Sequence, residues 1–343
     1  MKITVLAGGL SPERDVSLSS GSLIANALMD AGHLVAFVDV YEGIVAGGAG
    51  EFRSAAGGKK YTFTVPSTEP DLEAIRSRNG NRKELVGPGV LELCRAADLV
   101  FIALHGAMGE NGQLQAFLDV YGIPYTGSSF AGCLLAMDKD ITKRLLVREN
   151  IPTAPWIMYD PKTDVPGRIF TEIGLPCAVK PCGCGSSVGV SLVRTDSELE
   201  KALVYAQKYE NLVLVEKMIE GREFSVGILD GKALPPIEII PKTGFYDYQN
   251  KYQGGMTEEI CPASLSADET GKVQDSALAV HRSLHLGGYS RIDFILDRLG
   301  TFWCLEANTL PGMTPTSLLP QEAAAAGITY GELCEKIAQM AIR

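Results

Sequence analysis

Two parts of this sequence repeat the order of a short apolar run, a glycine-containing loop and an amphipathic helix. Residues 2–7 are apolar and β-prone, residues 8–9 are glycines that interrupt the run, and residues 15–31 carry apolar side chains at helical spacing. Residues 99–104 form a second apolar run, which ends at a His-Gly pair and precedes a helical pattern over residues 113–121. Because buried strands of parallel sheets read as continuous apolar runs, this order predicts a doubly wound α/β unit at the N-terminus.

The whole chain has 343 residues, which is more than the roughly 250–300 residues of a single core. The pattern of expected helices and strands changes twice after the N-terminal unit. A helix over 138–148 and strands over 177–180 and 188–193 predict a small α+β unit. The last third has the pattern of an antiparallel sheet, with expected strands over 224–229, 236–240, 289–296 and 302–308 and helices over 267–285 and near the C-terminus. We therefore predict three domains, 1–127, 128–215 and 216–343, with an insertion over about 42–88 whose structure the sequence does not indicate.

The composition excludes several classes of protein. The formal net charge is −10 at pH 7 and no block of lysine and arginine occurs, so nucleic acid is not an expected partner. No run approaches the roughly 18 apolar residues of a membrane span, and the first apolar run is too short for a signal peptide. We therefore expect a cytoplasmic protein that does not bind membranes, in which the cysteines are reduced.

The most informative segment is a predicted hairpin over residues 290–308. Side chains alternate along a strand, so Arg291 and Asp293 share one face, and Glu306 and Asn308 share a face of the partner strand. The other side chains of these strands are mostly apolar and are expected in the core. Burying charged side chains among them costs free energy unless a partner or a cation offsets the charge. Mg²⁺ takes such oxygen ligands when it also holds phosphates, so the hairpin predicts a magnesium site. A buried network of Arg291 with the carboxylates and no metal is the alternative.

A second motif extends from Lys180 to Gly189. A lysine at a strand end, followed by glycines and serines, offers backbone N–H groups and a positive charge to phosphate oxygens. The order of lysine and glycine differs from that of a Walker loop, and a strand follows instead of a helix. A flap over phosphates fits this pattern better, and a plain glycine-rich turn is the alternative.

Three loops carry further candidates. Glu13 and His105 both follow apolar strands of the N-terminal unit, and ligands of α/β sheets bind outside the carboxyl ends of strands. The glycine pattern of a dinucleotide site is missing there, and solvated loop side chains are the alternative. Residues 244–255 form an aromatic loop bounded by glycines, which predicts either a lid that excludes water or an Ω-loop packed on its own tyrosines.

Several ordered segments together resemble the D-alanine–D-alanine ligase family, which has the ATP-grasp fold. They extend over nearly the whole chain: residues 9–17 (GLSPERDVS), 105–112 (HGAMGENG), 137–139 (MDK), 185–189 (GSSVG) and 306–314 (EANTLPGMT). The resemblance implies an ATP-grasp fold with an N-terminal α/β domain. It also implies an enzyme that joins two D-alanines for peptidoglycan precursor synthesis. ATP would phosphorylate the carboxylate of the first D-alanine, and the amine of the second would attack the acyl phosphate.

The resemblance assigns roles in ATP and metal binding to individual residues. It implies that the nucleotide is bound by Lys139 and Lys180 at the phosphates, Glu216, Lys217 and Ile219 at the adenine, Glu223 at the ribose, and Ser187 in the glycine-rich loop. It implies that Asp293, Glu306 and Asn308 hold two Mg²⁺ ions, for which Mn²⁺ is an expected substitute. The metal ligands agree with those predicted independently from the hairpin.

The resemblance also assigns residues to the amino-acid substrates. Glu13 would bind the ammonium group of the first D-alanine, and Ser186 and Tyr252 would link the flap and the lid over the site, with His105 nearby. The remaining roles are oxyanion stabilisation by Arg291 and the Gly312 N–H, contact with the transferred phosphate by Lys251, and binding of the second carboxylate by Ser317 and the Leu318 N–H.

Related activities remain as alternatives. Some relatives join D-alanine to D-serine or D-lactate, and the pair Lys251-Tyr252 favours D-alanine as the second substrate. A ligase of another carboxylate and amine, such as a glutathione-type ligase, and a nucleotide-binding regulator without turnover are more distant alternatives. The resemblance implies a homodimer.

Overall fold

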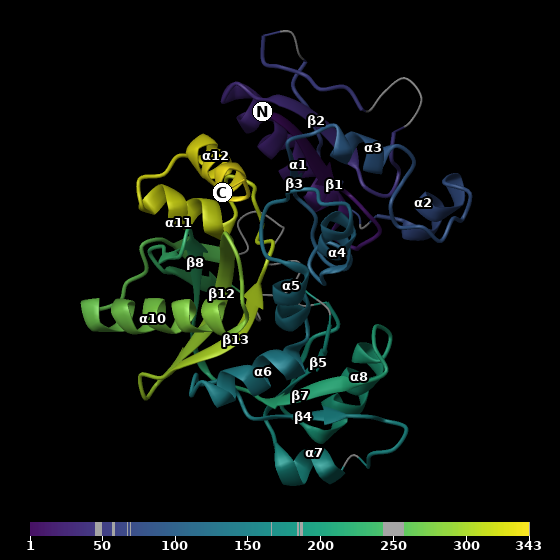
Figure 1. Cartoon of the computed structure of the whole chain (residues 1–343). Coiled ribbons are helices and arrows are strands. Elements are labelled where there is room, and N and C mark those ends of the chain that lie inside the picture. Colours follow the sequence, from purple (N-terminus) through teal and green to yellow (C-terminus); the bar gives the residue numbers. More distant parts are fainter. Residues whose placement is uncertain are drawn as a thin grey trace.

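The computed structural model describes residues 1–44, 50–56, 59–66, 68, 70–165, 167–183, 185, 188–242 and 257–342. Its strands form three sheets, which lie in separate parts of the molecule (Figure 1). The N-terminal sheet lies at the top of that view, the sheet formed mainly by the last third of the chain lies at the left, and the sheet of the middle part lies at the bottom.

The N-terminal sheet has the strand order β2-β1-β3 and is parallel throughout. Its strands are β1 (Lys2–Ala7), β2 (Leu34–Asp39) and β3 (Leu99–Ile102), and its helices are α1 (Arg14–Asp30), α3 (Val90–Arg95) and α4 (Gln113–Val120). The predicted strand–loop–helix order is therefore present. Strand β2 was missing from the sequence prediction, although its side chains are apolar and largely buried.

The region over 42–88 contains α2 (Leu72–Arg78) as its one helix among the described residues. Elsewhere hydrogen bonds from its own backbone hold it to the N-terminal unit. The amide of Asn26 on α1 donates to Tyr61 O at 2.8 Å and accepts from Tyr61 N at 2.9 Å. Arg53 pairs with Val35 of β2 through two backbone hydrogen bonds. The region thus lies against α1 and β2.

The middle sheet is antiparallel, with the order β4-β7-β5-β6. It consists of β4 (Trp156–Tyr159), β5 (Cys177–Pro181), β6 (Ser191–Val193) and β7 (Val213–Lys217). Helices α7 (Gly167–Glu172) and α8 (Asp196–Ala206) contribute Ile169, Leu199 and Leu203 to its core. The chain enters this part through α5 (Phe130–Met137) and α6 (Lys139–Arg148). Strand β6 is shorter than the predicted run over 188–193.

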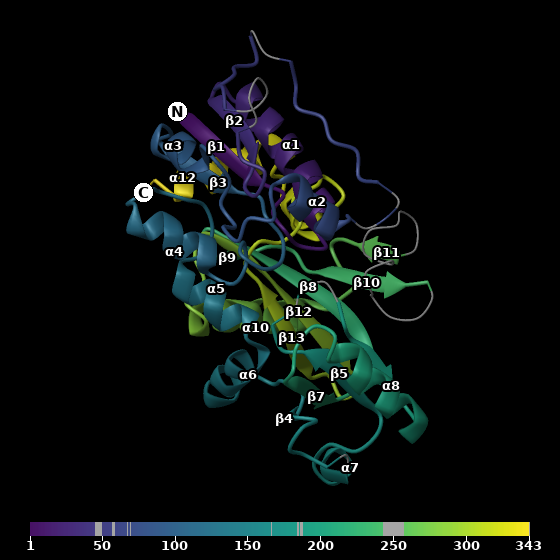
Figure 2. The same ribbon diagram turned by 90° about the vertical axis from the view of Figure 1, so that its right-hand side faces the viewer.

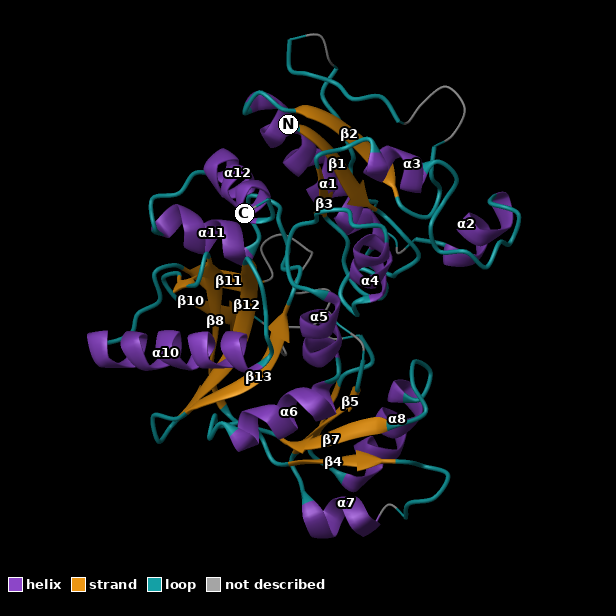
Figure 3. Ribbon diagram, viewed as in Figure 1, coloured by secondary structure: helices purple, strands orange, loops and turns teal. Residues whose placement is uncertain are grey.

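The third sheet has the order β11-β10-β8-β12-β13, and the short strand β9 (Lys232–Ala233) pairs with β8 (Figure 3). Its other strands are β8 (Gly221–Leu229), β10 (Ile237–Pro241), β11 (Thr257–Ile260), β12 (Tyr289–Asp297) and β13 (Phe302–Asn308), all paired antiparallel. Helix α10 (Ala267–Ser283) covers one face and buries Val273, Ala277 and Val280 there. Helices α11 (Leu318–Ala325) and α12 (Tyr330–Met340) follow β13.

The last helix returns to the N-terminal part of the molecule. Helix α12 packs against α1, and Leu333 and Ile337 belong to the same buried cluster as Ile3 and Leu28 (Figures 1 and 2). The glutamate Glu335 of α12 also contacts His33 Nε2 at 2.6 Å. The domain boundaries given above remain predictions, and the sequence did not predict this return of the C-terminus.

None of the helices in the described ranges combines the length and the apolar character needed to cross a membrane. The seven cysteines that the structure describes are all unpaired thiols.

Candidate active site

The hairpin β12–β13 brings polar side chains together in the interior. Residue Arg291 lies opposite Asn308 and Asp293 lies opposite Glu306, and the register shifts after Asp293. Asp293 accepts hydrogen bonds from Arg291 Nε at 2.9 Å and Nη2 at 2.7 Å, and from Asn308 Nδ2 at 3.0 Å. The hydroxyl of Ser225 on β8 donates to Asp293 Oδ1 at 2.8 Å. Strand alternation therefore placed Arg291, Asp293 and Asn308 together, as the sequence predicted.

A cavity of about 560 Å³ lies between the middle and third sheets. Its lining includes every residue predicted for the nucleotide that the structure describes, namely Lys139, Lys180, Glu216, Lys217, Ile219 and Glu223. Two of the predicted metal ligands, Asp293 and Glu306, line the same cavity. One continuous space thus contacts both groups of residues, and we refer to it as the first cavity.

Glu216 is the most strongly buried acid of the first cavity. Its carboxylate contacts the ammonium groups of Lys180 and Lys143, the latter with 2.7 Å between Nζ and Oε2. Burial by itself would raise the pKa of Glu216, but the two ammonium groups outweigh this effect and lower the pKa to about 2. The carboxylate is therefore ionised at neutral pH. The sequence analysis assigned no role to Lys143.

A second cavity of about 470 Å³ lies at the carboxyl ends of the N-terminal strands. Its lining contains the residues predicted for the amino-acid substrates that the structure describes, namely Glu13, His105, Arg291, Gly312, Ser317 and Leu318. The predicted metal ligand Asn308 lines this cavity and hydrogen-bonds Asp293, which lines the first. The two cavities thus adjoin at the Arg291–Asp293–Asn308 cluster.

His105 presents an unpaired ring nitrogen in the second cavity. Its Nδ1 lies 3.1 Å from Leu310 O, and because a carbonyl only accepts, the proton is assigned to Nδ1. Burial lowers the pKa of His105, so the ring is neutral at pH 7. Its Nε2 has no hydrogen-bond partner within the described ranges and is available as an acceptor.

Glu110 is a site residue to which the sequence analysis gave no role. Its Oε2 accepts from Gly106 N at 2.7 Å, and the side chain lines the second cavity. Burial, followed by the negative charge of Glu13, raises the pKa of Glu110 to about 8. A Cβ added to Gly185 would lie 3.9 Å from the carboxylates of both Glu13 and Glu110. The glycine-rich loop therefore lies, at Gly185, close to two carboxylates that line the second cavity. The signal for Glu110 was its place in the segment 105–112.

The start of α11 lies at the edge of the second cavity. Ser317 is the residue before the helix, and its side chain makes no capping hydrogen bond. Its Oγ instead accepts from Thr314 N at 3.2 Å and lies 2.8 Å from Thr314 Oγ1. The first backbone N–H groups of a helix carry a partial positive charge that favours an anion. The position of Ser317 and Leu318 is thus compatible with a carboxylate ligand.

Four predicted site residues lie outside the described residues: Ser186, Ser187, Lys251 and Tyr252. The whole aromatic loop over 244–255 and Cys184 of the glycine-rich loop lie outside them as well. Their roles remain predictions.

The structure adds one further buried carboxyl group near the cluster. Glu322 of α11 is fully buried, and neither of its oxygens has a hydrogen-bond partner in the part of the chain that the structure describes. A Cβ on Gly227 of β8 would lie 2.5 Å from Glu322 Oε2, so only glycine leaves space for this carboxyl. Burial raises the pKa of Glu322 well above its ordinary value, although the charge of Arg291 opposes the shift.

We expect Glu322→Gln to become more stable relative to the wild type as the pH rises above about 4. In the unfolded chain Glu322 ionises above a pKa of about 4.3, whereas in the folded protein it stays protonated to higher pH. The stability of the wild type therefore falls, relative to the variant, by about 1.4 kcal/mol for each pH unit between these two pKa values. Urea unfolding at several pH values measures the difference, with the exposed Glu200→Gln as control. A variant less stable than the wild type at pH 8 would mean that Glu322 is ionised and paired.

Comparisons with known proteins agree with this arrangement. Family models described as the D-ala D-ala ligase N-terminus and C-terminus match residues 2–128 and 145–339. The chain is 41% identical to D-alanine–D-alanine ligase of Pediococcus pentosaceus, with 98% of this chain and 96% of the relative covered. It is 40% identical to the enzyme of the same name from Lacticaseibacillus casei, with 97% and 93% covered.

A solved structure supports the fold. The crystal structure of D-alanine–D-alanine ligase from Bacillus anthracis complexed with ATP has a TM-score of 0.78 to this chain, with 29% identity. The similarity covers 100% of this chain and 98% of that one. It confirms the predicted ATP-grasp fold with its N-terminal α/β domain. Over nearly its full length, the chain belongs to the D-alanine–D-alanine ligase family.

Proposed function

We propose that this protein is an ATP-dependent D-alanine–D-alanine ligase that supplies the dipeptide for peptidoglycan precursor synthesis in the cytoplasm. One observation carries the proposal: the first and second cavities adjoin at Arg291, Asp293 and Asn308. A γ-phosphate in the first cavity and a carboxylate in the second would approach each other at this cluster. Phosphoryl transfer to a carboxylate requires such an approach.

In the proposed reaction, a carboxylate oxygen of the first D-alanine attacks the γ-phosphorus and ADP leaves. The amine of the second D-alanine then attacks the acyl carbon, and phosphate leaves with the oxygen that came from the carboxylate. Lys139 and Lys180 would orient the phosphates, and Glu13 would bind the ammonium group of the first D-alanine. Arg291 and the Gly312 N–H would stabilise the tetrahedral oxyanion. Closure over the cavities matters because water would hydrolyse an acyl phosphate.

The donor set fits magnesium. Asp293, Glu306 and Asn308 offer oxygen atoms, and the amide of Asn308 uses its nitrogen on Asp293, which leaves its oxygen for a cation. No group of three or more His, Cys, Asp or Glu side chains within the described ranges forms a metal site by itself. A cation held by Asp293, Glu306 and Asn308 would complete its coordination with phosphate oxygens of the substrate. When bound, Mg²⁺ would neutralise charge on the phosphoryl oxygens.

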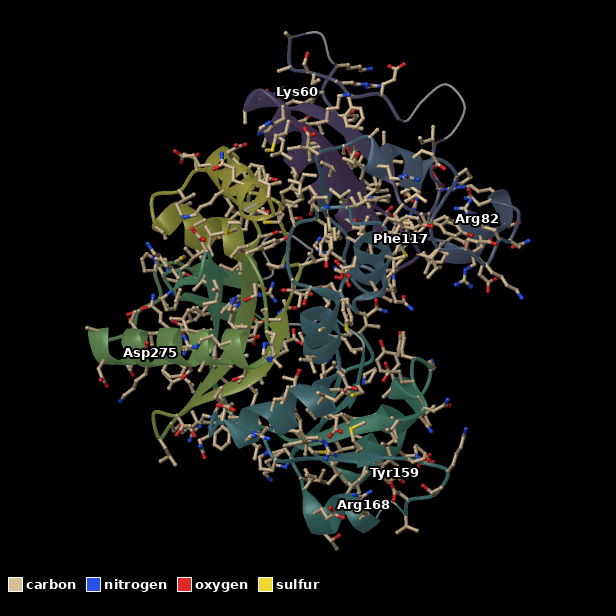
Figure 4. All side chains as sticks on the ribbon, in the orientation of Figure 1. Lys60, Arg82, Phe117, Tyr159, Arg168 and Asp275 are labelled. Atoms are coloured by element: carbon tan, nitrogen blue, oxygen red, sulfur yellow. The ribbon has the colours of Figure 1, made fainter. Side chains whose placement is uncertain are left out.

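We also propose a homodimer, because large apolar side chains remain exposed on α4 and α5. Val120 is 82% exposed, and Phe130 and Leu134 are about half exposed. Phe117, labelled on α4 in Figure 4, makes an edge contact with Tyr121 at 5.2 Å between ring centroids. A partner subunit covering these side chains would remove apolar area from water.

Light scattering of the purified protein would show twice the monomer mass of 36.7 kDa, and a monomer at micromolar concentration would contradict this proposal.

The amino-acid dependence of ADP release tests the proposed activity. With Mg²⁺ and ATP, D-alanine alone is expected to stimulate release strongly and L-alanine is not. Stimulation that requires D-serine or D-lactate would instead identify a ligase with another second substrate, and would contradict the prediction of D-alanine from Lys251-Tyr252. Failure of every D-amino acid would contradict the proposed substrates, and absence of ATP turnover would favour a regulator. The presence of Arg291 together with all three predicted metal ligands argues against the regulator.

A further inference from the structure

Lys143 is a buried lysine of α6 with no role in the reaction proposed above. Its side chain is 3% exposed, and a single buried ammonium group is costly unless oxygens surround it. Here it donates to Thr153 Oγ1 at 2.8 Å and to Ala154 O at 3.0 Å, and it contacts Glu216 Oε2 at 2.7 Å. Two hydrogen bonds and one ion pair thus surround the ammonium group. The side chain is therefore fixed in position.

Glu216 joins this lysine to the first cavity. One carboxylate oxygen contacts Lys143 and the other contacts Lys180, so the carboxylate lies between two cations. Lys180 and Glu216 line the cavity, whereas Lys143 does not belong to its lining. Lys143 therefore acts on a nucleotide through its partners that line the cavity, Glu216 and Ala154.

The same ammonium group is connected to the strand that carries a predicted metal ligand. Thr153, which accepts from Lys143, donates its own hydroxyl to Cys304 O of β13 at 3.1 Å. Two residues along the chain, Glu306 lines the first cavity. Lys143 thus connects the adenine side of the cavity, at β7, with the metal side, at β13.

We propose that Lys143 is a positioning residue for the nucleotide, which holds the Glu216 carboxylate in place so that Lys180 can direct its ammonium group to the phosphates. This inference rests on the proposed ATP site. A carboxylate with Lys180 as its only counter-charge would hold that lysine more tightly, because the attraction is strong in a buried site. Because Lys143 also neutralises Glu216, Lys180 can contact both Glu216 and a phosphate with a smaller loss of favourable electrostatic energy.

Equilibrium binding of an ATP analogue with an imido group between the β- and γ-phosphates, measured by calorimetry with Mg²⁺, tests this inference. Methionine has nearly the volume of lysine without the charge, so Lys143→Met removes the counter-charge and keeps the packing. We expect the Kd to rise at least about tenfold. The matched control is Lys201→Met on the exposed side of α8, which should bind as the wild type does.

Measuring the effect of Lys143→Met in the Glu216→Gln variant as well separates positioning from a merely structural role. In Glu216→Gln the carboxylate charge is absent, so adding Lys143→Met should change the Kd by less than about threefold. The inference would be overturned if Lys143→Met weakened binding of the analogue equally in the wild type and in Glu216→Gln. An unchanged Kd in Lys143→Met would overturn it as well. If Lys143→Met alone does not fold, a rise in Kd of more than about threefold from Glu216→Gln to the double variant would still overturn the inference. A wild type that does not bind the analogue would instead contradict the ATP site, and with it the proposed function.

Discussion

Replacing Glu306 with glutamine is expected to lower magnesium-dependent turnover by at least about 100-fold while the protein remains folded. Glu306 lies opposite Asp293 in the β12–β13 register, and both line the first cavity. The amide keeps the shape of the side chain and removes the negative charge that a divalent cation requires. The loss should appear mainly in kcat at saturating ATP, because the metal stabilises charge that develops during phosphoryl transfer.

The measurement for this variant is initial-rate kinetics over a range of Mg²⁺ concentrations, with thermal unfolding as a check of folding. Glu200→Gln, an exposed position on α8, makes the same chemical change away from the site and should retain full activity. Near-normal turnover of Glu306→Gln at ordinary Mg²⁺ concentrations would remove Glu306 from the metal site.

A second large loss of turnover is expected for Arg291→Lys. The guanidinium group binds Asp293 through two parallel hydrogen bonds, of 2.9 and 2.7 Å, and lines the second cavity. A lysine keeps the charge but cannot reproduce the planar fork, so both Asp293 and the oxyanion would lose oriented donors. Loss of one such donor commonly costs about 10²–10³ in kcat. We expect a loss of this size with a smaller change in the KM for ATP.

Steady-state kinetics of Arg291→Lys would be compared with Arg298→Lys, which makes the same replacement at an exposed position after β12. An unchanged kcat in Arg291→Lys would show that the guanidinium group does not stabilise the transition state. A rise in KM for ATP at constant kcat would mean that Arg291 serves binding of the nucleotide only.

Local patterns predicted the part of the site that depends on strand geometry. Arg291 and Asp293 are two residues apart, and the hairpin fixes which residues face them, so alternation sufficed to bring them to Asn308. The register shift after Asp293 was not predictable, because a bulge leaves little trace in an apolar run. The apolar strand β2 was missed because it follows α1 closely and precedes a region without clear periodicity.

Buried charges away from the hairpin could not be predicted in the same way. Lys143 is four residues after Lys139 on α6, and the sequence gives no sign that Thr153, Ala154 and Glu216 surround it. Glu322 depends likewise on the space left by Gly227, nearly a hundred residues earlier in the chain. Such contacts arise from packing between elements that are distant in sequence. The resemblance identified most residues that line the two cavities, but not the residues that support them.

Oxygen transfer from D-alanine to phosphate tests the central claim most directly. The protein would be incubated with Mg²⁺, ATP and D-alanine labelled with ¹⁸O in its carboxylate, and phosphate and dipeptide would be analysed by mass spectrometry. The proposed acyl phosphate predicts D-alanyl-D-alanine together with phosphate that carries one labelled oxygen for each dipeptide formed. Unlabelled phosphate, or phosphate without the dipeptide, would contradict the assignment of this chain as a D-alanine–D-alanine ligase.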